Sequence, residues 1–334
     1  MTNAFRSQTL LLLVMVLVHM SALLFGGTAH AQNYPDRPVT IQGGYGPGGL
    51  GDNAARRMAQ RLSEIWNVPV VVEPKPGAAG MLAAGSVIKA PADGYNLLYV
   101  IPETLSVTKA LKRPTPGFDP IADLQPVSLV ALSSSLLVVP TNSPHKSFKE
   151  LIAYVQKNPD RLTFGVQGIG SVFHLSLEQL KAAAGADISL IPYKGVGQAV
   201  TDLLAERLDG MILSSAVALP HVQARKLRVL AVASEGRIPQ MPEIPTIAES
   251  GFPGFAVPVG LSVMVRAGTP KHIVDKLSTD IRKVMAEPAM VDWLSSVSAV
   301  GTTLTPEEFR QRMRREIVQF QATIDRVGAQ KFAE

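Results

Sequence analysis

The sequence predicts an α/β fold, because short apolar strands, glycine-rich loops and amphipathic helices follow one another along the chain. A β-branched run at residues 39–41 leads into a loop at residues 43–52 and then into an apolar helical stripe. The same order recurs where residues 162–166 meet the glycine-rich turn 167–171, and where residues 189–193 meet a further loop. Repeated units of strand, loop and helix are typical of sheets with helices on their faces.

Length and composition predict two domains or one large α/β unit, and a small anionic ligand rather than nucleic acid. Of the 334 residues, 46% are apolar. Roughly 300 residues remain after removal of a secretion signal, which is more than a single hydrophobic core usually holds. The net charge of +5 becomes +4 in the mature chain (31 Lys and Arg minus 27 Asp and Glu), because Arg6 lies in the signal. Aromatic residues are only 6% and the positive charges are scattered, which disfavours nucleic acid.

Residues 1–31 are predicted to be a secretory signal peptide. Arg6 precedes an apolar run at residues 10–25, and Ala29 and Ala31 follow at the spacing of a cleavage site. The run is too short for a spanning helix, so we expect cleavage after Ala31, with an uncleaved anchor as the alternative. The sequence has no Cys, which excludes disulfides and a lipid-attachment cysteine.

The loop at residues 43–52 is predicted to bind a ligand. Its glycines let the backbone approach a ligand closely, and Pro47 restricts its flexibility. The helix that follows begins at this loop and carries apolar residues at helical spacing: Ala55, Met58, Ala59, Leu62, Ile65 and Trp66. The unpaired amides and the positive dipole end of a helix N-terminus favour a carboxylate or a phosphate.

Between this helix and residue 139 the pattern predicts strands, one helix and one irregular crossing. Residues 68–73 are expected to form a buried strand. The prolines within residues 102–126 predict a surface crossing without regular structure, and residues 127–139 one long strand. The other elements expected here are a second glycine and proline loop, a helix and a strand: residues 74–80, 81–89 and 95–101.

In the second half, cap signals mark the starts of several helices. Ser147 and Glu150 have the spacing of a capping box, which predicts a helix up to about Lys157. Pro270 stands at a first helical position, and residues 305–308 predict a capping box for the last helix. The remaining expected elements are the strands 211–214, 229–233 and 257–265, and helices at 198–207, around His221 and at 289–297.

Enzyme motifs are incomplete, although a secreted Ser/His-dependent hydrolase stays open as the alternative function. Ser171 and His174 could supply a nucleophile and a base, but no Gly-x-Ser-x-Gly elbow occurs. Residues 143–146 match Ser-x-x-Lys formally, without the elements that accompany that motif in penicillin-binding enzymes. Dinucleotide, phosphate-loop and His-Glu-x-x-His patterns are also missing, so neither a cofactor nor a metal is expected.

Several segments, in order, carry a family resemblance. They include Pro47-Gly48-Gly49-x-x-Asp52, Gly168-x-Gly170-Ser171-x-x-His174-Leu175, Pro192-Tyr193-Lys194-Gly195 and Ala267-Gly268-Thr269-Pro270, together with residues 34–39, 71–80, 93–98, 226–232 and 245–255. Through them the mature chain resembles, nearly end to end, the periplasmic solute-binding receptors of tripartite tricarboxylate transporters, the Bug family (TctC-like). Singly each motif is weak, but their order is specific.

The resemblance implies a type II-like periplasmic-binding-protein fold, with a ligand cleft between two lobes that close about a hinge. Each lobe would be a mixed, mostly parallel sheet flanked by helices, lobe 1 from residues 32–130 plus 252–334 and lobe 2 from residues 131–251. It also implies a periplasmic, monomeric receptor without enzymatic activity. Such a receptor would capture a small organic carboxylate for membrane permease subunits or a sensor kinase.

Ligand-binding residues are carried over from the resemblance, position by position. The first lobe would contribute Tyr45, Gly46, Pro47, Gly48 and Gly49, and the second lobe Gly168, Gly170, Ser171, Lys194 and Ser214. In the family these loops hold carboxylate oxygens largely through backbone amides, hydroxyls and water.

For four residues in or near this set, a structural role is an alternative to ligand contact. Ser171 could equally be the N-cap of its helix, and both roles can hold at once. His174 is predicted to be a packed residue rather than a ligand contact, and Lys194 could be a solvated loop charge. Asp52 is best explained as a carboxylate at a helix start.

The chain departs from the family pattern at four positions that bear on specificity. Gly44 stands where Pro usually precedes the aromatic residue of the first loop, and Val166 stands where Ser is frequent. Ser214 falls where Asn is common, and Gly260 occupies the place of a usual Trp. We interpret these changes as making a roomier, less polar pocket for a bulkier or aromatic carboxylate.

Overall fold

The computed structural model describes residues 34–46, 49–112, 117–302 and 304–332. The chain divides into two compact units, Met1–Asp36 and Arg37–Glu334, and every helix and strand given below belongs to the second. The predicted signal peptide lies outside the described residues. Among the residues that are described, no helix has both the length and the apolar content that crossing a membrane requires.

The first sheet combines the beginning of the second unit with its end. Its strands are β1 (Val39–Gly43), β2 (Val70–Pro74), β3 (Asn96–Val100), β4 (Leu124–Ser133), β10 (Val259–Arg266) and β11 (Ala299–Gly301). Within the described residues their order is β11-β4-β10-β3-β1-β2. β1 pairs in parallel with β2 and β3, whereas β10 runs antiparallel to β3 and β4, and β11 antiparallel to β4.

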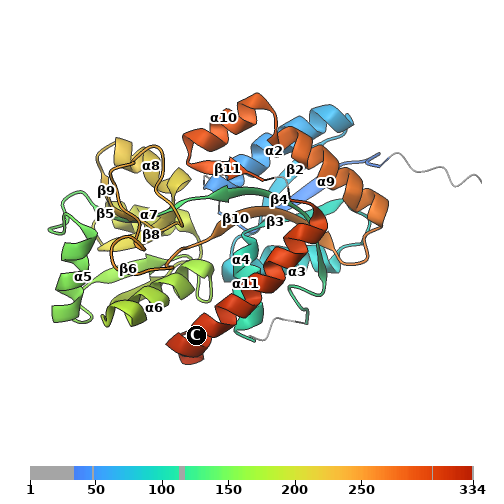
Figure 1. Cartoon of the computed structure of the whole chain (residues 1–334). Coiled ribbons are helices and arrows are strands. Elements are labelled where there is room, and N and C mark those ends of the chain that lie inside the picture. The colour runs from blue at the N-terminus through green and yellow to red at the C-terminus, as the bar shows by residue number, and fades with distance from the viewer. Residues whose placement is uncertain (1–33, 47–48, 113–116, 303, 333–334) are drawn as a thin grey trace, which may run out of the picture. The chain divides into compact units, whose positions relative to one another are not determined.

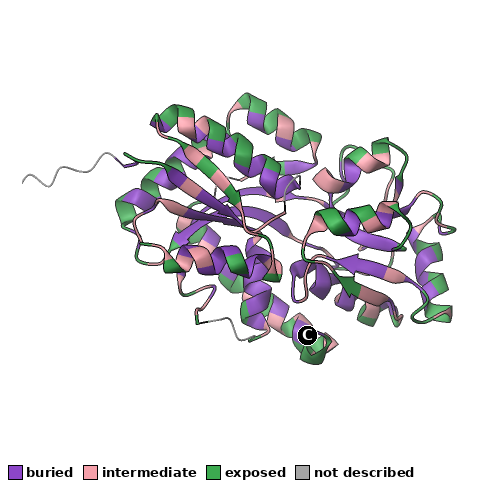
Figure 2. Cartoon of the chain, turned by 180° about the vertical axis from the view of Figure 1, so that it is seen from behind, coloured by how far each residue is buried: buried purple, intermediate pink, exposed green. Residues whose placement is uncertain are grey.

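Helices from both ends of the unit cover this sheet. They are α2 (Leu50–Trp66), α3 (Met81–Lys89), α4 (Pro102–Ala110), α9 (Lys271–Met285), α10 (Pro288–Ser296) and α11 (Pro306–Val327), with the short 3-10 helix η1 (Ala78–Gly80) before α3. α2 and α9 contact each other, and α3, α4 and α11 share one buried cluster with β3, β4 and β10. Most of the strands are buried, except at the edge strand β2, while the helices expose their outer faces (Figure 2).

The second sheet is formed by the middle of the chain. Its strands are β5 (Ser135–Pro140), β6 (Thr163–Val166), β7 (Ser189–Pro192), β8 (Gly210–Ser214) and β9 (Leu227–Val232), in the order β7-β6-β8-β5-β9. β6 pairs in parallel with β7 and β8, and β5 pairs antiparallel with β8 and β9. α5 (Phe148–Lys157) and α6 (Val172–Ala184) belong to one core cluster, and α7 (Val196–Leu204) and α8 (Ser215–Gln223) to another.

Two mixed sheets flanked by helices confirm the predicted fold class, with one difference in strand direction. Parallel pairs were expected to be in the majority. In the described residues the first sheet has two parallel and three antiparallel pairs, and the second has two of each. The antiparallel pairs involve β4, β5, β9 and β10, the strands at which the chain leaves one sheet and enters the other. Local sequence does not reveal such pairing.

Residues 102–126, predicted as an irregular surface crossing, instead begin with the buried helix α4. Pro102 occupies a first-turn position, where the missing amide hydrogen breaks no helical bond. Thr104, Leu105 and Val107 are buried, and Leu105 packs in the cluster with α3 and α11. The prediction was wrong because it rested on the breakers Pro114, Pro116 and Pro120, and α4 ends at Ala110, before the first of them.

Two strand predictions also need correction. Residues 127–139 form the two strands β4 and β5, which belong to different sheets, rather than one long strand. Residues 68–73 were expected to be buried, but β2 is an edge strand and Val71 is 48% exposed. Nearby, Ile65 of the predicted apolar stripe on α2 is also exposed. Apolar composition alone does not distinguish an edge from a sheet centre.

The last helix, α11, joins the cores of the two sheets. Phe309 and Met313 near its start lie in the cluster of the first sheet, whereas Phe320 and Ile324 near its end lie in the cluster that contains α5 and α6. Figure 1 shows this helix, in red, passing α4 and ending near α6. Its predicted capping box is present, with Thr305 and Glu308 bonding each other's amides.

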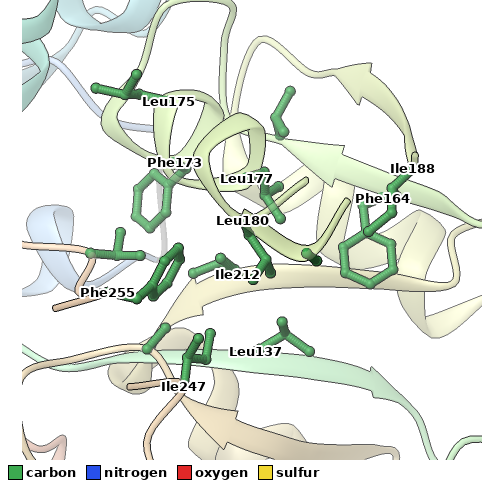
Figure 3. Packing of buried hydrophobic residues seen from close by; sticks show 14 of the residues in the cluster. Leu137, Phe164, Phe173, Leu175, Leu177, Leu180, Ile188, Ile212, Ile247 and Phe255 are labelled. Carbon is green, nitrogen blue, oxygen red and sulfur yellow. The ribbon is translucent and has the colours of Figure 1, made fainter. Parts of the chain in front are cut away.

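In the core of the second sheet, the ring of Phe164 fills the space that a side chain at Gly210 would need. Phe164 of β6 is fully buried, and Figure 3 shows it with its neighbours Ile188 and Ile212. Gly210 of β8 is its partner in the strand register. A Cβ added at Gly210 would lie 2.5 Å from Phe164 Cζ, so any larger residue must displace the ring.

Gly210→Ala should therefore destabilise the protein by about 1–3 kcal/mol, the usual cost of overpacking a core. Chemical denaturation of the variant and the parent protein measures this difference. Gly236→Ala is the matched control, because a Cβ at Gly236 meets no atom within 4 Å. Equal losses in the two variants would contradict the steric argument.

Candidate functional site

A cavity of about 520 Å³, counted with its opening to solvent, lies where loops of both sheets meet. The loops that follow β1, β2 and β3 line it with Gly44, Tyr45, Gly46, Gly77, Ala79, Gly80, Val100, Ile101 and Thr104. The loops that follow β6 and β7 line it with Gln167, Ser171, Phe173, Lys194, Gly195 and Val196. Because these strands run parallel within each sheet, their carboxyl ends present the loops at one edge.

Four helices begin at this cavity. The N-cap residues of α3, α4, α6 and α7 are Gly80, Ile101, Ser171 and Gly195, and all four line it. Of these caps only Ser171 uses its side chain to bond a helix amide. First-turn amides and the positive end of the helix dipole attract anions. No Asp or Glu occurs among the described lining residues, and Lys194 adds a positive charge.

The predicted first-lobe loop is only partly at the cavity. Tyr45 and Gly46 line it, and Gly49 is the N-cap of α2, where an added Cβ would lie 3.6 Å from Val196 Cγ1. Pro47 and Gly48 lie outside the described residues. The start of α2 is thus close to the second sheet's side of the cavity.

Tyr45 has a buried hydroxyl group without a hydrogen-bond partner among the described residues. Its ring lies against Gly51, where an added Cβ would clash with it, and makes an edge contact with Tyr99 at a centroid distance of 5.8 Å. Burial, together with the nearby Tyr99 and Glu103, raises the pKa of the Tyr45 phenol well above its usual value. The group is therefore a neutral hydrogen-bond donor at neutral pH.

The predicted second-lobe glycines use their amides internally. The Gly168 amide donates to Val166 O at 3.1 Å, and the Gly170 amide donates to His174 Nδ1 at 3.1 Å. Both glycines have positive φ, which explains the residue type. The amides that α6 leaves without a helical partner are those of its first turn, at Val172 and Phe173. Phe173, not the glycines, lines the cavity there.

Ser171 is a helix cap that also lines the cavity. Its Oγ accepts a hydrogen bond from the His174 amide at 3.2 Å, and the hydroxyl hydrogen can still be donated to a ligand. His174 is buried and its ring contacts Phe332, as the packing interpretation predicts. Because His174 Nδ1 accepts from Gly170, that nitrogen is not available to take a proton from Ser171.

Lys194 and Ser214 lie in different surroundings. Lys194 is an exposed lining residue, and no ion pair with the described acidic residues engages its ammonium group. Ser214 ends β8 opposite Ser135 and is the N-cap of α8, but it is not among the lining residues. Asp52 pairs with Arg56 at 3.0 Å in the first turns of α2.

None of the four departures expected to enlarge the pocket is seen to do so, and one of them, Ser214, is not among the lining residues. A Cβ at Gly44 would lie 3.2 Å from Gly80 Cα and from Val100 Cγ2, so that space is already filled. Val166 lies in the hydrophobic core. Gly260 accommodates the carboxylate of Glu103, which would lie 2.9 Å from an added Cβ. The interpretation as a roomier pocket was wrong, because these positions pack against protein atoms.

Sequence reasoning missed the contribution of the second glycine loop and of α4. Gly77, Ala79 and Gly80 were recognised as a loop but not as lining, and Thr104 was placed in an irregular crossing. Both contributions could have been expected, because the loop and α4 each follow a predicted strand. These strands, β2 and β3, are the neighbours of β1 in the sheet. Gln167 begins the predicted glycine-rich turn and Phe173 follows it. Both line the cavity and could have been included because they stand after a predicted strand.

Comparison with known proteins identifies relatives over most of the chain. Residues 54–327 match the family described as "Tripartite tricarboxylate transporter family receptor". Protein BugT of Bordetella pertussis is 30% identical over 318 residues, which cover 95% of this chain and 98% of that protein.

Solved structures of similar proteins share the fold. The periplasmic binding protein BugD is 31% identical, with a TM-score of 0.84 over 89% of this chain and 99% of its own. Rpa4515 of R. palustris, solved with adipate, is 32% identical, with a TM-score of 0.84 over 88% and 98% of the two chains. MatC of Rhodopseudomonas palustris, solved with bound malate, is 28% identical, with a TM-score of 0.82 over 87% and 100%.

Tyr45→Phe should leave the ligand-free protein as stable as the parent or more stable by about 1 kcal/mol, because it removes a buried hydroxyl without a partner. Thermal unfolding measures the change. Tyr99→Phe is the matched control, since its hydroxyl is also buried and unpaired but does not line the cavity. A clear loss of stability in Tyr45→Phe alone would show that the hydroxyl bonds the protein itself.

Proposed function

Because the chain belongs to the family of tripartite tricarboxylate transporter receptors, we propose that it captures a carboxylate-bearing small molecule in the cavity between its two sheets. The solved relatives that hold adipate or malate support this ligand class. The observation that carries the proposal is the convergence of four helix N-termini on a cavity whose described lining has no acidic side chain.

The arrangement of charge suits a ligand with a carboxylate at each end. The starts of α3 and α4 lie on the side of the first sheet, and the starts of α6 and α7 lie on the side of the second, with Lys194 beside them. Val100, Ile101, Phe173 and Val196 supply apolar walls for the body of the ligand. An aliphatic dicarboxylate satisfies both features. An aromatic acid was expected because Val166 and Gly260 were thought to widen the pocket. Both positions pack against protein atoms, so they do not support an aromatic ligand.

Within the proposed site, Tyr45, Gly46 and Gly49 with the undescribed Pro47 and Gly48 contribute the first-lobe loop. Ser171 and Lys194 contribute side chains from the second lobe, and the first-turn amides of α6 take the role that the resemblance implied for Gly168 and Gly170. Ser214 lies outside the lining and is not included.

The same proposal covers location, organisation and partners. The chain would act in the periplasm as a monomer, after cleavage behind Ala31, and deliver its ligand to permease subunits or a sensor kinase. The lobes would be residues 32–130 plus 252–334 and residues 131–251. The relationship to receptors such as BugD supports this assignment.

Receptor function without turnover is preferred over the hydrolase alternative. A hydrolase needs a base that accepts the proton of the Ser171 hydroxyl, and His174 Nδ1 already accepts from the Gly170 amide. The Ser171 hydroxyl is likewise engaged as a helix cap.

Ligand-free mature protein should be stabilised selectively by a dicarboxylate in a panel of adipate, malate, citrate, benzoate and amino acids. At about a hundred times its dissociation constant a ligand adds roughly 2.7 kcal/mol, which raises Tm by about 5 °C. Unfolding and refolding beforehand removes any co-purified ligand. If no carboxylate shifts Tm, the proposed function is wrong; if only benzoate does, the class is wrong.

Ser171→Ala should weaken binding of the dicarboxylate by about tenfold, because a hydrogen bond to a charged group is worth roughly 1.5–3 kcal/mol. Titration calorimetry measures the affinity. Ser147→Ala is the matched control: Ser147 caps α5 with the same geometry, its Oγ accepting at 3.2 Å, but it does not line the cavity.

Both serine variants should lose about 1 kcal/mol of stability through the missing cap. Equal affinities in the two would exclude Ser171 from the site. Turnover of an ester or amide that Ser171→Ala abolishes would instead support the hydrolase.

A further inference from the structure

Glu103 is a fully buried carboxylate directly behind the cavity. It stands in the first turn of α4, next to Thr104 and two residues after Ile101, both of which line the cavity. Its Oε2 accepts a hydrogen bond from the Gly260 amide of β10 at 2.8 Å, and its Oε1 accepts one from Arg312 Nη2 of α11 at 3.1 Å. These two bonds tie the start of α4 to the sheet and to the last helix.

Arg312 serves a second carboxylate. Its Nε donates to Glu316 Oε1 at 2.6 Å, one turn further along α11. Glu316 is 7% exposed, and its Oε2 is buried without a partner among the described residues. One guanidinium group is thus shared by two buried carboxylates, which leaves the cluster one negative charge in excess when both are ionised.

A buried excess charge is costly, and a proton removes it. Burial and the neighbouring charge of Glu103 together raise the pKa of Glu316 to about 7, although Arg312 and Arg315 oppose the shift. Burial also raises the pKa of Glu103, against the charge of Arg312 and the Gly260 amide.

Several charged groups on the elements around this cluster have partners of their own, whereas Arg315 of α11 acts on Glu316 by its charge. On α4, Lys109 pairs with Asp119, and on α6, Glu178 pairs with Lys181. β4, which also contacts α11, carries no charged side chain between Leu124 and Ser133. Tyr45 and Tyr99 are uncharged phenols whose pKa is raised by burial.

We propose that Glu103, Arg312 and Glu316 form a positioning cluster that holds the first turn of α4 at the cavity and binds one proton between its two carboxylates. If the ligand is an anion, as the proposed function states, the neutralised cluster repels it less. Binding should then be tighter at low pH than at high pH, and a bound anion should favour proton uptake by the same factor.

The sign of the stability effect follows from the raised pKa of Glu316. Between the ordinary value of 4.5 and about 7, the folded protein holds a proton that the unfolded chain has released. This group therefore makes the protein less stable as the pH rises through that window, and no further change follows above it.

Glu316→Gln tests the proposal, because it mimics the protonated carboxyl group at every pH. In ligand-free protein, the gain in Tm over the parent should be a few degrees larger at about pH 8 than at about pH 5. Adipate serves as the anionic probe. The parent should bind it about fourfold more tightly at pH 6 than at pH 8, and Glu316→Gln should bind it equally at both.

Glu307→Gln is the matched control on the same helix, since Glu307 is exposed and pairs with Arg310. Its affinity ratio and its Tm difference should follow the parent protein. If Glu316→Gln keeps the parent's pH dependence in both measurements, a group outside this cluster titrates and the proposal is wrong. If adipate and the other carboxylates fail to bind at any pH, the proposed function fails, and the ligand-free comparison still decides whether Glu316 holds the proton.

Discussion

Parallel pairing of three strands along one side of each sheet is the constraint on which the cavity depends. β1 lies between two parallel neighbours, and β6 likewise. Each of these strands therefore ends at the same edge of its sheet, and the chain must leave that edge through a loop and a helix. The helix N-termini are gathered there by topology, and among the lining residues that the structure describes Lys194 alone is charged.

Close approach of backbone to backbone then shapes the cavity. Gly44 and Gly80 come so near that a Cβ on the first would lie 3.2 Å from the Cα of the second. Gly168, with positive φ, similarly faces Ala79 across the two sheets, at 3.4 Å for an added Cβ. The glycine loops thus bring α3 and α6 close together, because glycine lets the two backbones pack closely.

Without disulfides, the relative placement of α4 and α6 depends on buried contacts with α11. The start of that helix belongs to the core of the first sheet and its end to the core of the second. Arg312 and Glu316 lie between these two apolar halves, where α11 passes the first turn of α4. A buried ionic cluster contributes little net stability compared with apolar packing, but it specifies one geometry of the groups it joins. That property suits a position directly behind the cavity.

The sequence by itself determined the order of strands, glycine loops and helices, and the caps at Ser171 and Thr305. These follow from local periodicity and from the few residues that can cap a helix or take positive φ. The tertiary structure alone decided that β4 and β5 belong to different sheets, that β2 is an edge and that α4 is buried. It also decided that Gly260 makes room for Glu103 rather than for a ligand, and that Glu103 and Glu316 share one arginine. Those relations join residues far apart in the chain, and no local pattern encodes which distant side chain fills a given space.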